Sequence, residues 1–393
     1  MTGLARTPVA PSRLPRVGTT IFTTMSALAQ QHGAVNLGQG FPDFACDPRL
    51  IDAVTHAMQA GHNQYPPMAG VAVLREAVAS KIEALCGHRY DPGNEITITA
   101  GATQAILTAI LALVHPGDEV IVLEPCYDSY EPNIELAGGK VVRVPLESGS
   151  FRPDFKAIEN ALTPRTRAML VNTPHNPSAA VWSEVDMHRL ASLLRPTDVI
   201  VIADEVYEHM VYDGAVHQSV ARHPELAARS VLISSFGKSF HVTGWKVGYA
   251  AAPAALSAEF RKVHQFNVFT VNTPMQHAIA RYLTDPGPYR ACRRSTKPNA
   301  IASAAALLPL RCACYPARAA TSSAWTIRPW ANTATETKRR FVAGSLPRSA
   351  SRRFRCRRST RRGSSSAWCA FALPSSMRPS TPHCKGCSAM PAN

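Results

Sequence analysis

The chain of 393 residues has no long apolar run, and it contains few charged or aromatic residues. Charged residues make up 18% of it and aromatic residues 7%, whereas 46% are hydrophobic. No stretch approaches the roughly 18 consecutive apolar residues that a membrane helix needs, so we expect no membrane association. The N-terminus also lacks the apolar core of a secretory signal, which favours a cytoplasmic protein. The apolar content excludes disorder throughout, and the length favours two domains.

Acidic residues are almost missing from the last part of the chain. Residues 287–393 contain 20 Lys or Arg and one acid, Glu336, whereas residues 1–286 carry a net charge of −4. Cysteine follows the same division, with three in the first part and seven in the second. The overall net charge of +15 therefore describes neither part, and the two parts require separate interpretations.

The first part has the pattern of an α/β fold. Apolar runs typical of buried strands recur at Glu95–Thr99, Glu119–Leu123, Val141–Val144, Ala168–Asn172, Val199–Ala203 and Val231–Ser234. Segments with helical spacing lie at Ala102–Val114, Arg152–Leu162, Ser183–Leu194 and Ser257–Val268. The alternation predicts a mostly parallel sheet with helices on both faces. Because such sheets bind ligands beyond the carboxyl ends of their strands, we expect the functional residues to lie in the loops there.

Two of these loops offer hydrogen-bonding groups. Residues 99–104 place a Gly-Ala-Thr turn before an apolar helix, and the free backbone N–H groups at a helix start attract an anion such as phosphate. Residues 172–177 contain two X-Pro steps, which hold the loop extended and fix the direction of the Asn176 amide. Taken alone, the first pattern is more typical of a plain helix cap and the second of a turn.

Two further loops carry charge. Asp204 follows the most apolar strand, where a carboxylate is costly unless a cation meets it, although a helix cap is an equal explanation. Lys238 lies among small and apolar residues after another buried strand. Burial there would lower the pKa of the amine and make it a nucleophile, whereas a lysine taken at random is a solvated surface charge.

Together the four loops supply a phosphate cradle, an amide, a carboxylate and a desolvated lysine, which are the groups that bind pyridoxal phosphate. Residues from about 20 to 285 resemble the class I/II aminotransferases of fold type I, and within them the branch of kynurenine aminotransferases (cysteine-conjugate β-lyases) and bacterial methionine aminotransferases. The resemblance rests on seven blocks in the family's order, which are Asn36–Asp43, Asn63–Tyr65, Gly101–Gln104, Glu124–Tyr127, Asn172–Pro177, Asp204–Tyr207, and Ser235–Lys238 with Gly244–Lys246.

The resemblance implies a role for each matching residue around the cofactor ring. Lys238 would bind the cofactor covalently and move the substrate proton. Asp204 would keep the pyridine nitrogen protonated, which lets the ring accept electrons. Asn176 and Tyr207 would hydrogen-bond the ring oxygen, and Tyr127 would stack on the ring face.

It also implies the contacts at the edges of the site. The cofactor phosphate would be bound by Gly101, Ala102, Thr103, Ser235 and Lys246. Tyr65 would reach the phosphate of a partner subunit, so the resemblance implies a homodimer. Gly40 lies in the segment that would cover the substrate carboxylate, and Gly40 and Asn176 would bind the substrate. No metal is expected.

The resemblance further implies a mostly parallel, seven-stranded sheet and a division of the chain. Residues 1–45 would form an N-terminal segment over the active site, residues 46–285 the large domain that binds pyridoxal phosphate, and residues 286–393 an anomalous tail. The implied reaction moves an amino group from an amino acid (methionine, aromatic, glutamine or kynurenine) to a 2-oxo acid. The alternatives are β-elimination from cysteine conjugates and an inactive product.

The tail departs from the family pattern. The family ends in a small domain in which an arginine, within an Arg-Phe-Cys-Phe-Ala-like strand, binds the substrate carboxylate. Here Arg, Ser and Pro runs such as 352–366 replace it. A nucleic-acid arm is one interpretation, but we expect no nucleic-acid partner. A metal module built on Cys312, Cys314, Cys384 and Cys387 is another, and it is weak because the spacings do not match a known site.

A shifted reading frame is the third interpretation, and the genetic code supports it. Trp368 has only the codon TGG and the Cys369 codon begins with TG, so reading one base earlier gives valine. With permitted codons, residues 368–375 then become Val-Arg-Phe-Cys-Phe-Ala-Lys. The same shift turns residues 294–303 and 314–325 into segments that resemble the family's C-terminal domain. We favour this interpretation.

We therefore expect protease to remove residues beyond about 290 quickly while the core resists longer, because Arg/Ser/Pro runs bury too little apolar area to become ordered. The chain as written should transaminate very weakly or not at all. Restoring the frame by one base near codons 288–294 should recover activity and a compact C-terminal domain. A protease-resistant tail, or full turnover by the chain as written, would show that the tail is a genuine domain.

Overall fold

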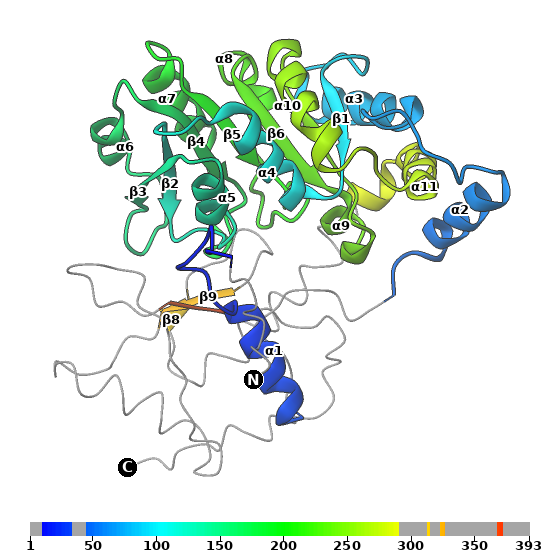
Figure 1. Cartoon of the computed structure of the whole chain (residues 1–393), viewed down its shortest axis with the longest axis horizontal. Helices are drawn as coiled ribbons and strands as arrows, with labels where there is room; N and C mark the ends of the chain where they lie inside the picture. Colours follow the sequence, from blue (N-terminus) through cyan, green and yellow to red (C-terminus); the bar gives the residue numbers. More distant parts are fainter. Residues whose placement is uncertain (1–9, 34–44, 291–312, 315–322, 327–367, 372–393) are drawn as a thin grey trace, which may run out of the picture.

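The computed structural model describes residues 10–33, 45–290, 313–314, 323–326 and 368–371. Gly40 and most of the tail lie outside these residues, as do Cys312, Cys384 and Cys387. Residues 45–290 form a sheet with helices packed against it (Figure 1).

The sheet has seven strands, in the order β1-β7-β6-β5-β4-β2-β3. They are β1 (Ile96–Thr99), β2 (Glu119–Glu124), β3 (Lys140–Pro145), β4 (Thr166–Asn172), β5 (Ile200–Asp204), β6 (Ser230–Ser235) and β7 (Gly248–Ala251). Strands β3, β2, β4, β5 and β6 are parallel to one another, and β7 is antiparallel to the strands on both sides of it, β6 and β1. The predicted mostly parallel α/β sheet is confirmed, and all six predicted strands are present.

Strand β7 was not predicted from its own residues. Its sequence, Gly-Tyr-Ala-Ala, contains no β-branched residue and is short. It forms because it lies between β1 and β6 and pairs with both. Pairing with two neighbours compensates for a weak local preference.

Alternate residues of the central strands pack into two cores, one on each face of the sheet. In β2, Val120 and Val122 join the core that contains α4 (Ala102–Leu113), α5 (Tyr130–Leu136) and α10 (Ala254–Asn267). Ile121 and Leu123 of the same strand join the other core. That core contains α3 (Ala72–Cys86), α6 (Phe155–Ala161), α7 (Glu184–Leu194), α8 (Pro224–Ala227) and α11 (Thr273–Leu283). This period of two confirms that helices cover both faces.

Side-chain caps fix where several helices begin. Helix α6 begins three residues later than expected, because the Asp154 side chain accepts hydrogen bonds from the backbone N–H groups of Lys156 and Ala157. Helix α7 begins at a capping box formed by Ser183 and Asp186. The remaining helices are α1 (Ile21–Gln31), α2 (Pro48–Gln59) and α9 (Phe236–Ser239), with 3₁₀ turns at Val220–Arg222 and Thr243–Trp245.

Three short strands lie in the part of the tail that is described. They are β8 (Ala313–Cys314), β9 (Ser323–Thr326) and β10 (Trp368–Phe371), and they pair antiparallel in the order β10-β9-β8. The sequence pattern predicts no strand here, although Trp, Thr and Phe in β9 and β10 are strand-forming residues. Among the helices described, none is long and apolar enough to cross a membrane.

Candidate active site

The carboxyl ends of four strands meet at one edge of the sheet. In the pairing register, Asn172 of β4 lies opposite Asp204 of β5, and Asp204 lies opposite Ile233 of β6. Thr99 of β1 and Ser235 of β6 both pair with Gly248 of β7. The register therefore brings together the four loops that the sequence analysis selected.

Asp204 is buried, and two donors hold its carboxylate. Oδ2 accepts a hydrogen bond of 2.6 Å from the Tyr130 hydroxyl, and Oδ1 accepts one of 3.3 Å from the backbone N–H of Val206. Burial raises the pKa of Asp204, while these two bonds and the charge of Lys238 oppose the rise. The Asp204 carboxylate is thus buried, and among the described residues it forms no ion pair.

Lys238 lies on α9, directly after β6, and it is half-buried. Its Nζ lies 5.4 Å from the centroid of the Tyr207 ring. The turn that presents it requires Gly237, because a Cβ there would lie 2.9 Å from the Cα of Thr243. Burial raises the pKa of Tyr127, which a hydrogen bond with the Thr103 side chain and the charge of Lys238 lower. Tyr127 therefore lies within electrostatic reach of both Lys238 and Asp204.

The N-terminus of α4 lies beside Lys246. Gly101 is its N-cap at φ +79°, and no side chain caps the helix. A Cβ on Gly101 would lie 3.5 Å from Lys246 Nζ, and one on Gly248 would lie 3.2 Å from the carbonyl carbon of Gly101. The two glycines allow strand, helix and cation to approach closely. The free N–H groups at the start of α4, where Ala102 and Thr103 lie, are thus close to the Lys246 ammonium, and such groups are suited to an anion.

Asn172, which the sequence analysis placed in this loop without giving it a role, ties the Asn176 loop to β5. Asn172 accepts a hydrogen bond of 2.7 Å from the backbone N–H of Asn176 through its Oδ1. It donates one of 2.9 Å to the Asp204 carbonyl through its Nδ2. Tyr130 was missed in the same way. Its only signal in the sequence is its position three residues after Tyr127, at the start of a helix.

Tyr65 differs from the other predicted residues. Its side chain is 81% exposed, and its ring contacts Phe269 edge-on with centroids 5.3 Å apart. Ser235 is half-buried at the end of β6.

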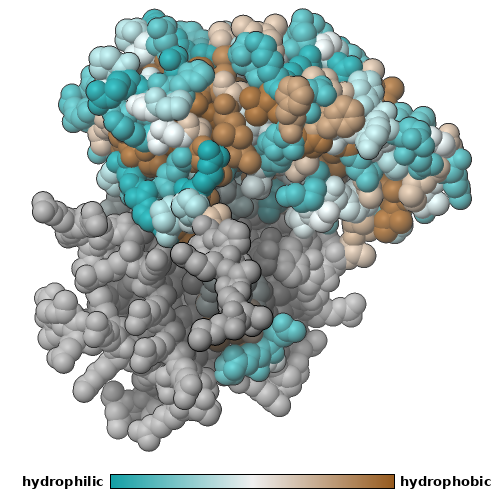
Figure 2. Space-filling model, viewed as in Figure 1, coloured by the Kyte–Doolittle hydropathy of each residue, from teal (hydrophilic) through white to brown (hydrophobic). Residues whose placement is uncertain are grey.

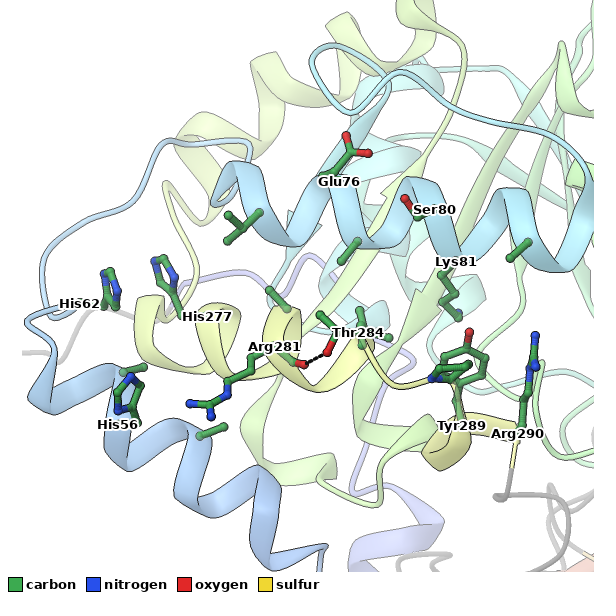
Figure 3. Close-up of a pocket in the computed structure, with 18 residues that line it drawn as sticks. His56, His62, Glu76, Ser80, Lys81, His277, Arg281, Thr284, Tyr289 and Arg290 are labelled. Atoms are coloured by element: carbon green, nitrogen blue, oxygen red, sulfur yellow. Dashed lines mark hydrogen bonds between the residues drawn. The ribbon is translucent and has the colours of Figure 1, made fainter.

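A cavity of about 720 Å³ lies elsewhere, between α2, α3 and α11 (Figure 3). His62 and His277 stack at one end of it with ring centroids 3.7 Å apart, and Lys81 and Tyr289 lie at the other. None of the residues predicted for the strand-end site lines it.

Comparisons with known proteins identify the family of the chain. The family described as aminotransferase class I and II matches residues 32–306. The chain is 52% identical to the methionine aminotransferase of Escherichia coli over 290 residues, which are 73% of this chain and 75% of that protein. It is 40% identical to the human kynurenine–oxoglutarate transaminase 1 over 266 residues, 64% of this chain and 63% of the relative.

A solved structure agrees with these sequence matches. The N-succinyldiaminopimelate aminotransferase of Mycobacterium tuberculosis superposes with a TM-score of 0.80 at 39% identity, covering 88% of this chain and 92% of that one. The chain therefore belongs to the class I and II aminotransferases of fold type I, and it is a pyridoxal-phosphate-dependent amino-acid aminotransferase.

Proposed function

We propose that the strand-end residues form the site in which pyridoxal phosphate and the substrate bind. The observation that carries the proposal is the pairing of two unlike groups at neighbouring strand ends. Asp204 is a buried carboxylate that forms no ion pair among the described residues, and the charge of the Lys238 amine lowers its pKa. A flat, cationic ring between these groups would form an ion pair with the Asp204 carboxylate and lie within reach of the Lys238 amine.

The residues fit the other parts of the cofactor as well. Lys246 and the uncapped N-terminus of α4, with Gly101, Ala102, Thr103 and Ser235, suit a phosphate. The half-buried Tyr127 suits one face of the ring, and Tyr207 with Asn176 suits the ring oxygen.

Each residue then has a task in the reaction. When bound, pyridoxal phosphate supplies an electron sink that acidifies the Cα–H bond of an amino acid. Lys238 Nζ would remove this proton from Cα and return it to the cofactor. Asp204 would keep a positive charge on the ring nitrogen during the transfer. Tyr207 and Asn176 keep the ring from tilting. The acceptor of the second half-reaction is a 2-oxo acid.

We propose methionine as the amino donor, with kynurenine and aromatic amino acids as alternatives; a relative that is 44% identical is named for N-succinyldiaminopimelate. The E. coli relative named for methionine is 52% identical to this chain over the aligned residues, against 40% for the human relative named for kynurenine. We also propose a cytoplasmic location. The division of the chain into residues 1–45, 46–285 and 286–393 remains our proposal, and residues 307–393 lie beyond the family match.

The surface supports a homodimer in which Tyr65 serves the partner's site. Large apolar side chains are exposed near α4 and α10, namely Tyr65 at 81%, Phe266 at 91%, Phe269 at 45% and Leu111 at 37%. Asn267, at the end of α10, donates a hydrogen bond to Thr108 of α4, so the two helix surfaces adjoin. Figure 2 has the same view as Figure 1, and over α4 and α10 it shows hydrophobic residues among hydrophilic ones. A second copy would cover this surface.

Borohydride reduction tests the position of the cofactor. Protein incubated with pyridoxal phosphate and then reduced should carry the label on Lys238, because this amine faces Asp204 and Tyr207. Peptide mass mapping checks the position, and Lys246 is the internal control because it also lies at this edge. Label on Lys246 or on any other lysine, or none in folded protein, would contradict the site.

Asp204→Asn tests the carboxylate. Made in the frame-restored protein, the variant should keep part of its cofactor, because the phosphate contacts remain, while formation of 2-oxo acid from methionine should fall by about 100-fold or more. Absorbance of the bound cofactor and product assays measure the two effects separately. Near-normal turnover would mean that Asp204 is only a helix cap.

Phe266→Asp tests the dimer. A buried charge at the interface should shift the protein from dimer to monomer in sedimentation velocity and weaken cofactor binding, since the partner's Tyr65 is lost with it. Val185→Asp is the matched control, because Val185 is 62% exposed on α7, against the other core. If both variants remain dimeric, the interface lies elsewhere.

A further inference from the structure

Tyr130 contacts two of the residues proposed to hold the cofactor. Its hydroxyl donates the 2.6 Å hydrogen bond to Asp204 Oδ2. Its ring packs edge-on against Tyr127, with ring centroids 5.7 Å apart and planes at 83°. We propose that Tyr130 is a positioning residue that fixes the position of the Asp204 carboxylate relative to the Tyr127 ring. The inference rests on the proposed function.

The direction of the hydrogen bond is fixed by its surroundings. Tyr130 is 2% exposed, and Asp204 lies beside it. Burial and the adjacent carboxylate hold the pKa of the phenol well above its ordinary range, so the hydroxyl stays protonated and donates. Asp204 must then accept, which keeps its charged form available for a cationic ring nitrogen.

The backbone fixes both contacts at one turn. Tyr130 is the first residue of α5, and its N–H donates a hydrogen bond of 3.2 Å to the carbonyl of Tyr127. The turn sets the spacing of the two rings, while the β5 register sets Asp204. Tyr130 thereby links Asp204, which we propose contacts the ring nitrogen, to Tyr127, which we propose lies on the ring face.

A merely structural tyrosine would stabilise the fold without affecting the charge of Asp204. Without the hydroxyl, Asp204 keeps its burial but loses one of the two hydrogen bonds that favour its charged form. Its pKa rises further, so the carboxylate becomes neutral at a higher pH. Cofactor held through that charge should then be lost at a higher pH as the solution is acidified.

The test compares Tyr130→Phe with Tyr282→Phe in the full chain. Tyr282 is the matched control, because its hydroxyl donates a 2.7 Å hydrogen bond to Asp47 Oδ2, away from the strand-end site. Tyr130→Phe should raise the dissociation constant for pyridoxal phosphate roughly 10-fold at neutral pH, and should move the acid loss of cofactor to higher pH. Tyr282→Phe should bind as the unaltered protein does. Tyr130→Leu, which also removes the ring, should bind more weakly than Tyr130→Phe.

A double variant separates positioning from folding. In the Asp204→Asn background, Tyr130→Phe should produce no further shift in the pH profile, because no carboxylate remains to be affected. Equal pH profiles for Tyr130→Phe and the unaltered protein, or the same shift in the Asp204→Asn background, would overturn the inference. Lys238 labelling in the unaltered protein is scored separately, so failure of the proposed function is recognised by its absence.

Discussion

The burial of the Asp204 carboxylate at the end of β5 is the constraint on which the site depends. An anion there is tolerated because the Tyr130 hydroxyl and the Val206 N–H donate to it, and because Lys238 lies close enough to act on it. These groups leave the charge only partly compensated. The protein thus maintains a position that favours a cationic ligand, which is what a protonated pyridine ring supplies.

The sheet topology makes this constraint useful. Parallel strands end at the same edge, so Asn172, Asp204 and Ser235 arrive there from β4, β5 and β6. The antiparallel β7 adds Gly248, whose missing side chain allows the first turn of α4 to approach. The groups that we propose for the cofactor ring and for its phosphate are therefore held by the same sheet, so little further ordering should be required when the cofactor binds.

The sequence alone predicted much of this arrangement because local signals were strong. Apolar strands ending in Asp204 or in the Lys238 loop, and the glycine-led start of α4, are visible in the residues. The resemblance to a family connected them. Strand β7 was not predicted, because Gly-Tyr-Ala-Ala has a weak strand preference and forms a strand by pairing with β1 and β6. The roles of Tyr130 and Asn172 were not predicted, because their hydrogen-bond partners lie 74 and 32 residues away along the chain and only the fold brings them together.

A crystal structure of the protein grown with pyridoxal phosphate tests the central claim most directly. The account predicts density continuous with Lys238 Nζ, a ring nitrogen within hydrogen-bonding distance of Asp204, and a phosphate against the N-terminus of α4. A ligand seated in the cavity between α2, α3 and α11, or one whose ring nitrogen points away from Asp204, would contradict it.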